Sequence, residues 1–333
     1  MNNRQIWLTL ITLALFAVVP PLAAIFDQPF YVDMLARVLI LALAAVSLDF
    51  ILGYGGMVSF GHAAYMGIGA YTVGIFSFYG IDNGFIQFPL AMAASALVGL
   101  IFGAMSLRTS GVYFIMITLA FAQMLYFLGI SLEEFGGDDG MTAARSEFAG
   151  LVDLNDSSQF YYLVLACLAL VLFILHRLVR SRFGMVIRAS RTNEKRMQAM
   201  GFHTYRYKLA GFTIAASICG LSGALFANLN EFVSPDIMHW TRSGEIMIMV
   251  IMGGMGTLIG PVLGAAGFLL LEEYLPQWME IFMTNAGEHW AIIMGPILIA
   301  IVLFGRGGIH ALFARKWFPR RSGARNGGGK GHG

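Results

Sequence analysis

Asp49 and His62 are ionisable side chains that lie inside apolar runs of this sequence. An ionisable residue at membrane depth is costly and by default predicts a functional site. In a self-sufficient transporter these two residues would supply a site for a coupling ion. Asp49 lies near one end of its run, so capping or snorkelling is the alternative explanation for it. A proton relay would need a series of carboxylates and histidines, and the sequence contains none.

Two glycine-interrupted segments have similar sequences, GGMVS at residues 55–59 and GGMGT at residues 253–257. Glycine-broken apolar segments in corresponding positions of a chain indicate a transport pathway. The alternative is that these glycines only let helices pack closely. Under the first interpretation the translocation path comprises Gly55, Gly56, Ser59, His62, Gly253, Gly254 and Thr257.

Motifs of intramembrane enzymes are absent from the sequence. It contains no HExxH, no GxSxG and no paired cysteines, and Cys167 and Cys219 both lie inside apolar runs. These patterns would mark a zinc site, a serine nucleophile or a disulfide. We therefore expect a protein that is not an enzyme and that needs no metal or cofactor.

Composition places the chain in a membrane. Hydrophobic residues make up 58% and charged residues 12%, with a mean hydropathy of +0.72. A soluble domain carries roughly 25% charged residues. The sequence predicts an all-α polytopic bundle of about 8–10 membrane segments, some of them discontinuous, because each crossing needs roughly 20 apolar residues. The expected segments are residues 6–26, 33–53, 59–79, 85–107, 111–130, 160–178, 209–229, 245–274 and 290–304.

Charge distribution predicts the topology. Residues 177–208 carry nine Lys or Arg against a single acid, so this segment is expected in the cytoplasm. The loop at 132–159 carries seven acids against one arginine and falls outside, which agrees with a cytoplasmic N-terminus. The seven cations after Phe304 reach the cytoplasm only if the chain reverses at residues 253–257, so we expect a discontinuous element there. The glycine-rich tail, 309–333, is expected to be cytoplasmic.

The cytoplasmic loop, residues 179–207, is long enough to hold a short helix that a soluble partner could bind. Asn193 can cap it, Glu194 favours its first turn, and Gly201 can close it. Met197 and Met200 lie three residues apart and are expected on one face. The alternative is a connector that only obeys the positive-inside rule. The external acidic loop likewise either docks a soluble partner or is a solvated connector.

The sequence resembles a known transporter family over residues 48–308. The matching blocks are LDFILGYGGMVSFGHAAYMGIGAYTVGIF, GVYFIMITLAFAQML with FGGDDGMT, FGMVIRASRTNEKRMQAMGFHTYRYKLAGFTIAASICGLSGALFA, and EIMIMVIMGGMGTLIGPVLGA. They are similar to LivM-type permeases of branched-chain amino acid ABC importers. The resemblance implies a single permease domain at 1–308 in a bacterial inner membrane, with both termini cytoplasmic.

The resemblance also implies partners: a LivH-type permease, two cytoplasmic ATP-binding subunits and an extracytoplasmic binding protein. In that family a coupling helix docks in a groove of the ATPase. The matching positions are Arg191, Asn193, Glu194, Met197, Met200 and Gly201. Branched-chain amino acids are the implied cargo, although related systems move urea, short amides or aromatic acids. The rival from another class is an ion-coupled secondary transporter that uses Asp49 and His62. The separated basic clusters fit two cytoplasmic faces, and no nucleic-acid partner is expected.

Overall fold

The computed structural model describes residues 3–25, 30–148, 150, 153–282, 292–296, 299–300 and 308, and the predicted all-α bundle is confirmed. The longer helices are α1 (Asn3–Ala17), α3 (Phe30–Asp49), α4 (His62–Phe78), α5 (Gly84–Ser106), α6 (Val112–Ser131), α7 (Ser157–Arg180), α8 (Arg182–Thr192), α10 (Thr204–Asn230), α11 (Trp240–Gly253) and α12 (Gly260–Phe282). The short elements are α2 (Val19–Ile25), α9 (Glu194–Ala199), a π-helix (Phe50–Tyr54), two 3₁₀ turns (Glu133–Phe135 and Pro235–Met238) and the strands β1 (Met141–Thr142) and β2 (Phe232–Val233).

Five stretches in the described part of the chain are long and apolar enough to cross a membrane. They are α3 with the π-helix that continues it, α5, α6, α7 and α10. The first expected span is instead two helices, because the prolines at positions 20 and 21 lie in the first turn of α2, where their missing N–H groups cost least. The last expected span and the tail fall mostly or wholly outside the described residues.

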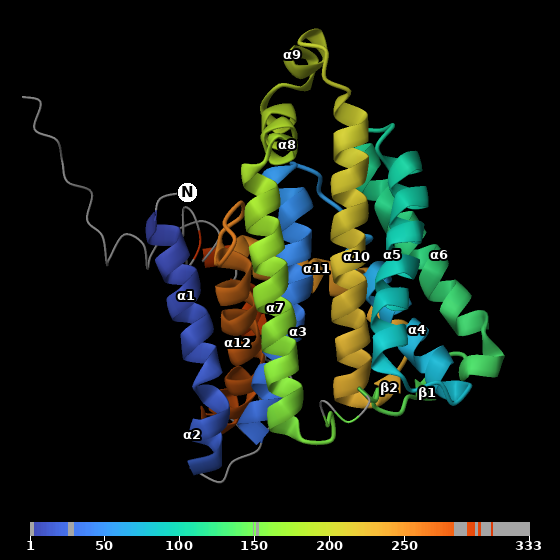
Figure 1. Cartoon of the computed structure of the whole chain (residues 1–333), viewed down its shortest axis with the longest axis vertical. Coiled ribbons are helices and arrows are strands. Elements are labelled where there is room, and N and C mark those ends of the chain that lie inside the picture. The colour runs from blue at the N-terminus through green and yellow to red at the C-terminus, as the bar shows by residue number, and fades with distance from the viewer. Residues whose placement is uncertain are drawn as a thin grey trace, which may run out of the picture.

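Helices α3 and α10 form the centre of the bundle (Figure 1). In α3, 89% of the apolar window is buried, and α10 packs against α3, α4 and α5. Small residues allow the closest approach: a Cβ at Gly69 of α4 would overlap the carbonyl oxygen of Gly220 in α10. Such contacts let backbones touch where lipid offers no hydrophobic driving force between helices.

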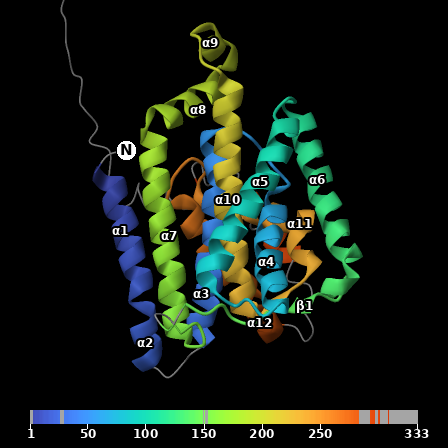
Figure 2. The same ribbon diagram turned by 45° about the vertical axis from the view of Figure 1, so that its right-hand side comes forward.

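The outer helices leave much of their apolar surface uncovered. Only 33% of the apolar window of α5 and 22% of that of α6 is buried. Figure 2 shows α6 at the edge of the bundle. Surface of this kind suits contact with lipid or with a second membrane subunit.

The two ends of the bundle differ in structure. Helices α8 and α9 extend beyond one end, and β1 pairs with β2 at the other (Figures 1 and 2). The acidic loop is fastened to the end of α10, because Arg145 forms an ion pair with Glu231 at 2.8 Å and Ser146 N donates to Asn228 Oδ1 at 2.7 Å. The two oppositely charged loops predicted to face different sides of the membrane therefore lie at opposite ends of the molecule.

The predicted break in residues 245–274 is present. Helix α11 ends at Gly253 and α12 begins at Gly260, and the two helices pack against each other as a hairpin. Gly308 lies back against the turn of this hairpin, since a Cβ there would be 2.5 Å from the Gly254 nitrogen. The chain has therefore returned to the level of the break by residue 308.

Candidate functional site

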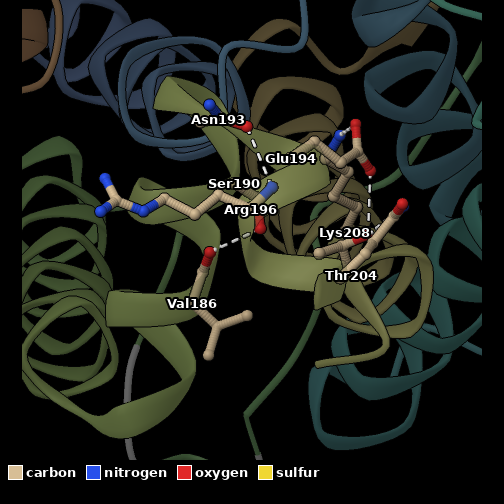
Figure 3. Close-up of polar contacts among 8 residues, drawn as sticks. Val186, Ser190, Asn193, Glu194, Arg196, Thr204 and Lys208 are labelled. Atoms are coloured by element: carbon tan, nitrogen blue, oxygen red, sulfur yellow. Dashed lines mark hydrogen bonds and ion pairs between the residues drawn. The ribbon is translucent and has the colours of Figure 1, made fainter. Parts of the chain in front are cut away.

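The segment that projects from the bundle is built as the sequence predicts. Asn193 caps α9 by accepting a hydrogen bond from Arg196 N at 3.0 Å (Figure 3). Glu194 follows in the first turn, and Gly201 lies just beyond the helix with φ at +87°. That left-handed conformation favours glycine, which ends the helix without the strain of a Cβ.

Glu194 joins α9 to the first turn of α10. Its carboxylate accepts hydrogen bonds from Thr204 Oγ1 at 2.9 Å and from Lys208 Nζ at 2.6 Å (Figure 3). Partial burial alone would raise the pKa of Glu194, but these two hydrogen bonds and the charge of Lys208 outweigh it, so the pKa lies below its ordinary value. In its charged form, the Glu194 carboxylate therefore holds α9 against α10.

The two methionines differ in exposure, and their placement on one face of the helix stays a prediction. Met197 is 7% exposed and Met200 is 58% exposed. Met200 is the C-cap of α9, and its N–H still donates to the Arg196 carbonyl oxygen at 3.1 Å. The accessible surface of the segment comes from Met200 and Phe202 together with basic side chains.

Arg191, the last basic residue of α8, reaches into the first glycine break. Its guanidinium donates a hydrogen bond to the carbonyl oxygen of Gly53. Gly53 belongs to the π-helix that ends α3, a geometry found mostly at functional sites. Gly56 has φ at +71°, and a Cβ there would lie 2.8 Å from Arg191 Cγ. This part of the chain therefore contacts both the aliphatic portion of the Arg191 side chain, at Gly56, and its guanidinium, at Gly53.

Asp49 connects the first break to the second. It is 2% exposed, and its Oδ1 accepts a hydrogen bond from Gly256 N at 2.7 Å. The Arg191 guanidinium also acts electrostatically on Asp49. A Cβ at Gly53 would overlap the Gly256 nitrogen, so the π-helix that leads into the first break touches the second break. Asp49 therefore serves as a hydrogen-bond acceptor for a backbone N–H that is 207 residues away in the sequence.

The remaining predicted path residues shape the two breaks. A Cβ at Gly55 would lie 2.6 Å from the Ile51 oxygen, and one at Gly253 would overlap the Gly260 oxygen. Gly254 has φ at +114°. Thr257 donates to Gly254 O at 2.8 Å and accepts from Gly260 N at 3.1 Å, so it caps α12.

His62 and Ser59 are both fully buried at the start of α4. His62 Nε2 lies 2.7 Å from Ser47 Oγ, and its Nδ1 has no hydrogen-bond partner among the described residues. Ser59 Oγ accepts from Gly61 N at 3.2 Å. Ser47 and Asp49 are two apart on α3 and so point away from each other. Asp49 and His62 therefore do not share a site.

Sequence reasoning missed a second set of charges inside the apolar runs. Arg37 lies in α3, and Glu272 and Glu273 lie in α12, each of them partly buried. Arg242 and Glu245 of α11 are close by and form an ion pair at 2.8 Å. The signal is present in the sequence, because the predicted membrane segments 33–53 and 245–274 contain four of these five charges.

Together these residues form a junction between the projecting segment and the two glycine breaks. In the described part of the chain no group of three or more His, Cys, Asp or Glu is arranged to hold a metal ion. One residue of the projecting segment, Arg191, contacts the first break, and Asp49 ties that break to the second. Broken backbone at this depth provides peptide groups whose hydrogen bonds can change when helices move.

Comparison with known proteins agrees with this architecture. Residues 30–302 match the model of a family described as branched-chain amino acid transport system, permease component. The high-affinity branched-chain amino acid transport permease protein LivM of Salmonella typhimurium is 29% identical over 287 residues, which cover 79% of this chain and 68% of that protein. The protein named LivH of Methanocaldococcus jannaschii is 25% identical over 279 residues, covering 78% and 84%. The autoinducer 2 import permease LsrC of Escherichia coli is 23% identical over 235 residues, covering 67% and 65%. No solved structure gives a significant match.

Proposed function

Because this chain belongs to the family of permease components of branched-chain amino acid transport systems, we propose that it is one membrane subunit of an ATP-driven importer. Its cargo is branched-chain amino acids, and a LivH-type permease forms the path with it. Two cytoplasmic ATP-binding subunits and an extracytoplasmic binding protein complete the assembly. The similarity to both LivM and LivH proteins supports a permease pair, and the multi-pass fold supports an inner-membrane location.

The observation that carries this proposal is the contact between Arg191 and Gly53. A helix that projects from the bundle is accessible to a soluble ATPase, but it can couple to transport only if it touches the path. Arg191 supports this coupling, because it bonds to Gly53 and lies against Gly56, a proposed path residue, and Glu194 fixes the same segment to α10. ATP binding would move α9, and the movement would reach the broken helices through these two anchors.

The mechanism is alternating access between two arrangements of the glycine breaks. The path residues are Gly55, Gly56, Ser59, His62, Gly253, Gly254 and Thr257. In the present arrangement Asp49 holds the two breaks together. Transport requires a second arrangement in which the Asp49–Gly256 hydrogen bond or the Arg191–Gly53 hydrogen bond is exchanged for another.

Both chain ends are assigned to the cytoplasm. The start of α1 lies toward the end of the bundle that carries α8 and α9 (Figure 1). Gly308 lies at the hairpin turn, which touches the π-helix beneath α8. Positive residues of the projecting segment favour the cytoplasmic side. These placements support the assignment, and the acidic loop at the other end then faces the binding protein.

The test is purification of the tagged full chain from its own membranes in mild detergent, with identification of the proteins that accompany it. Recovery of ATP-binding subunits that is lost on Glu194→Lys is the expected result. Glu134→Lys, an exposed acid of the outer loop given the same charge change, should retain them. Recovery of the chain alone, with uptake driven by a proton or sodium gradient, would overturn the proposal in favour of a secondary transporter.

Cargo is tested separately by ATP-dependent uptake of radiolabelled leucine in membrane vesicles with the binding protein present. Competition by isoleucine and valine, and none by urea, short amides or aromatic acids, is expected. The similarity to an autoinducer 2 permease makes this comparison necessary, because proteins of related sequence are named for different cargoes.

A further inference from the structure

A hollow of about 240 Å³ lies between α3 and α12, away from the glycine breaks. Its lining residues are Met34, Arg37, Leu269, Glu272 and Glu273. Arg37 precedes Asp49 by twelve positions on α3, which places it about 18 Å further along the helix axis. The hollow therefore lies in the half of the bundle opposite α8 and α9, where α3 begins (Figure 1).

The charges around this hollow do not neutralise one another by direct contact. Arg37 Nε is buried and has no hydrogen-bond partner among the residues that the structure describes. Within the same residues, no ion pair closer than 4.0 Å involves Arg37, Glu272 or Glu273. Arg37 nevertheless acts electrostatically on Glu272. A cation and an anion that lie near each other without forming a direct ion pair leave room between them for a ligand that carries both charges.

Arg37 also borders a second, smaller cavity of about 20 Å³. Arg242 and Glu245 line it, together with apolar side chains of α3, α4, α10 and α11. Its volume suits about one water molecule. The polar lining thus continues from the hollow toward α4, which begins at His62. Charges that face cavities inside a membrane bundle mark substrate pathways.

We propose that the hollow between α3 and α12 is a binding subsite for the zwitterionic head and aliphatic side chain of an α-amino acid. This inference rests on the proposed function and assigns a location to its cargo. The Arg37 guanidinium matches a carboxylate, and Glu272 with Glu273 can accept from an ammonium group. Met34 and Leu269 supply the apolar wall. A ligand with only one of the two charges leaves the other side of the site unpaired.

The test uses the complete importer in lipid nanodiscs, without the binding protein, and measures equilibrium binding of radiolabelled leucine. Competitors are leucinol, which lacks the carboxylate, and 4-methylpentanoate, which lacks the ammonium group. We expect each to compete at least about tenfold more weakly than unlabelled leucine, because one charged contact is lost.

Two variants separate ligand contact from a structural role. Arg37→Gln should remove the discrimination between leucine and leucinol, and Glu272→Gln that between leucine and 4-methylpentanoate. Arg37→Lys keeps the charge and should retain the discrimination at lower affinity. Asp33→Asn on α3 and Glu280→Gln on α12 are matched controls at exposed positions and should change nothing.

The subsite is refuted if the variants weaken all three ligands equally, or if the assembled complex binds no leucine at millimolar concentration. Binding-protein-dependent uptake of leucine by the same complex in proteoliposomes distinguishes the two proposals. Normal uptake without direct binding refutes the subsite alone. Absent uptake by a complex that contains its ATPases and binding protein refutes the branched-chain cargo as well.

Discussion

Replacing Asp49 with alanine should weaken the folded bundle more than its small change in side-chain size suggests. The carboxylate is 2% exposed, and its Oδ1 accepts the Gly256 N–H at 2.7 Å. Asp49→Ala leaves that N–H without its acceptor between two packed glycine breaks. It also removes the acid on which the Arg191 guanidinium acts.

The magnitude follows from the kind of bond that is lost. A hydrogen bond contributes about 0.5–1.5 kcal/mol between neutral groups and about 1.5–3 kcal/mol to a charged one, and a buried donor left unsatisfied costs about 1–3 kcal/mol. These figures describe the same event and are not summed, so we expect Asp49→Ala to lower the free energy of unfolding by about 2–3 kcal/mol. Asp49→Asn keeps an acceptor oxygen without the charge and should lose roughly half as much.

The assay is equilibrium unfolding of the purified chain in mixed micelles with increasing dodecyl sulfate. Asp33→Ala, at the exposed start of the same helix, is the matched control and should lie within about 0.5 kcal/mol of the parent. The reasoning is refuted if Asp49→Ala is as stable as this control. If Asp49→Asn equals the parent, the charge contributes nothing and Asp49 serves only as an acceptor.

Three further predictions concern positions with clear local geometry. Because the pKa of Glu194 is lowered from its ordinary value, its contribution to holding α9 on α10 is fully present above that ordinary value and is lost as the pH falls through the lowered pKa. Protease cleavage of the projecting segment should increase over that pH range, and Glu194→Gln should abolish this pH dependence. Gly201→Ala should cost about 1 kcal/mol of local stability, seen as faster amide exchange in α9, because its φ is +87° although no atom blocks a Cβ. Gly69→Ala should lower the melting temperature of the purified protein, because its Cβ would overlap the Gly220 carbonyl oxygen of α10, and overpacking of this kind costs about 1–3 kcal/mol. Gly129→Ala, whose nearest neighbour would be at 3.5 Å in helix α6, should not lower the melting temperature, and an equal loss in both variants would contradict the packing argument.

Local and charge-based features of this fold could be predicted from the sequence. The reversal at residues 253–257 followed from the positions of the cations, since only a broken helix returns the tail to the basic side. The cap at Asn193 and the left-handed Gly201 depend on neighbouring residues alone, so they were predictable as well. Residues close in sequence determine such features, and a single chain contains all the information that they need.

Contacts between distant segments could not be predicted in this way. Nothing in the sequence near Asp49 indicates that its partner is the Gly256 amide, and nothing near Arg191 indicates the Gly53 carbonyl. In both cases the partner is a backbone group. Because nearly every residue has such groups, no residue type in the sequence marks the partner. The burial of Met197 beside the exposed Met200 could not be predicted either, because it depends on how α9 sits on the rest of the bundle.

The length and attachments of α10 have a consequence for signalling across the membrane. Its 27 residues extend about 40 Å, and each end is fastened to a different loop. Lys208 near its start bonds to Glu194, and the residues at its other end hold the acidic loop through Asn228 and Glu231. A continuous helix resists compression. A displacement at one end of α10 therefore moves the whole helix, including its other end, as a rigid body. In the proposed importer, a binding protein that docks on the acidic loop would therefore alter the contacts of the ATP-binding subunits without any signal passing through the cargo.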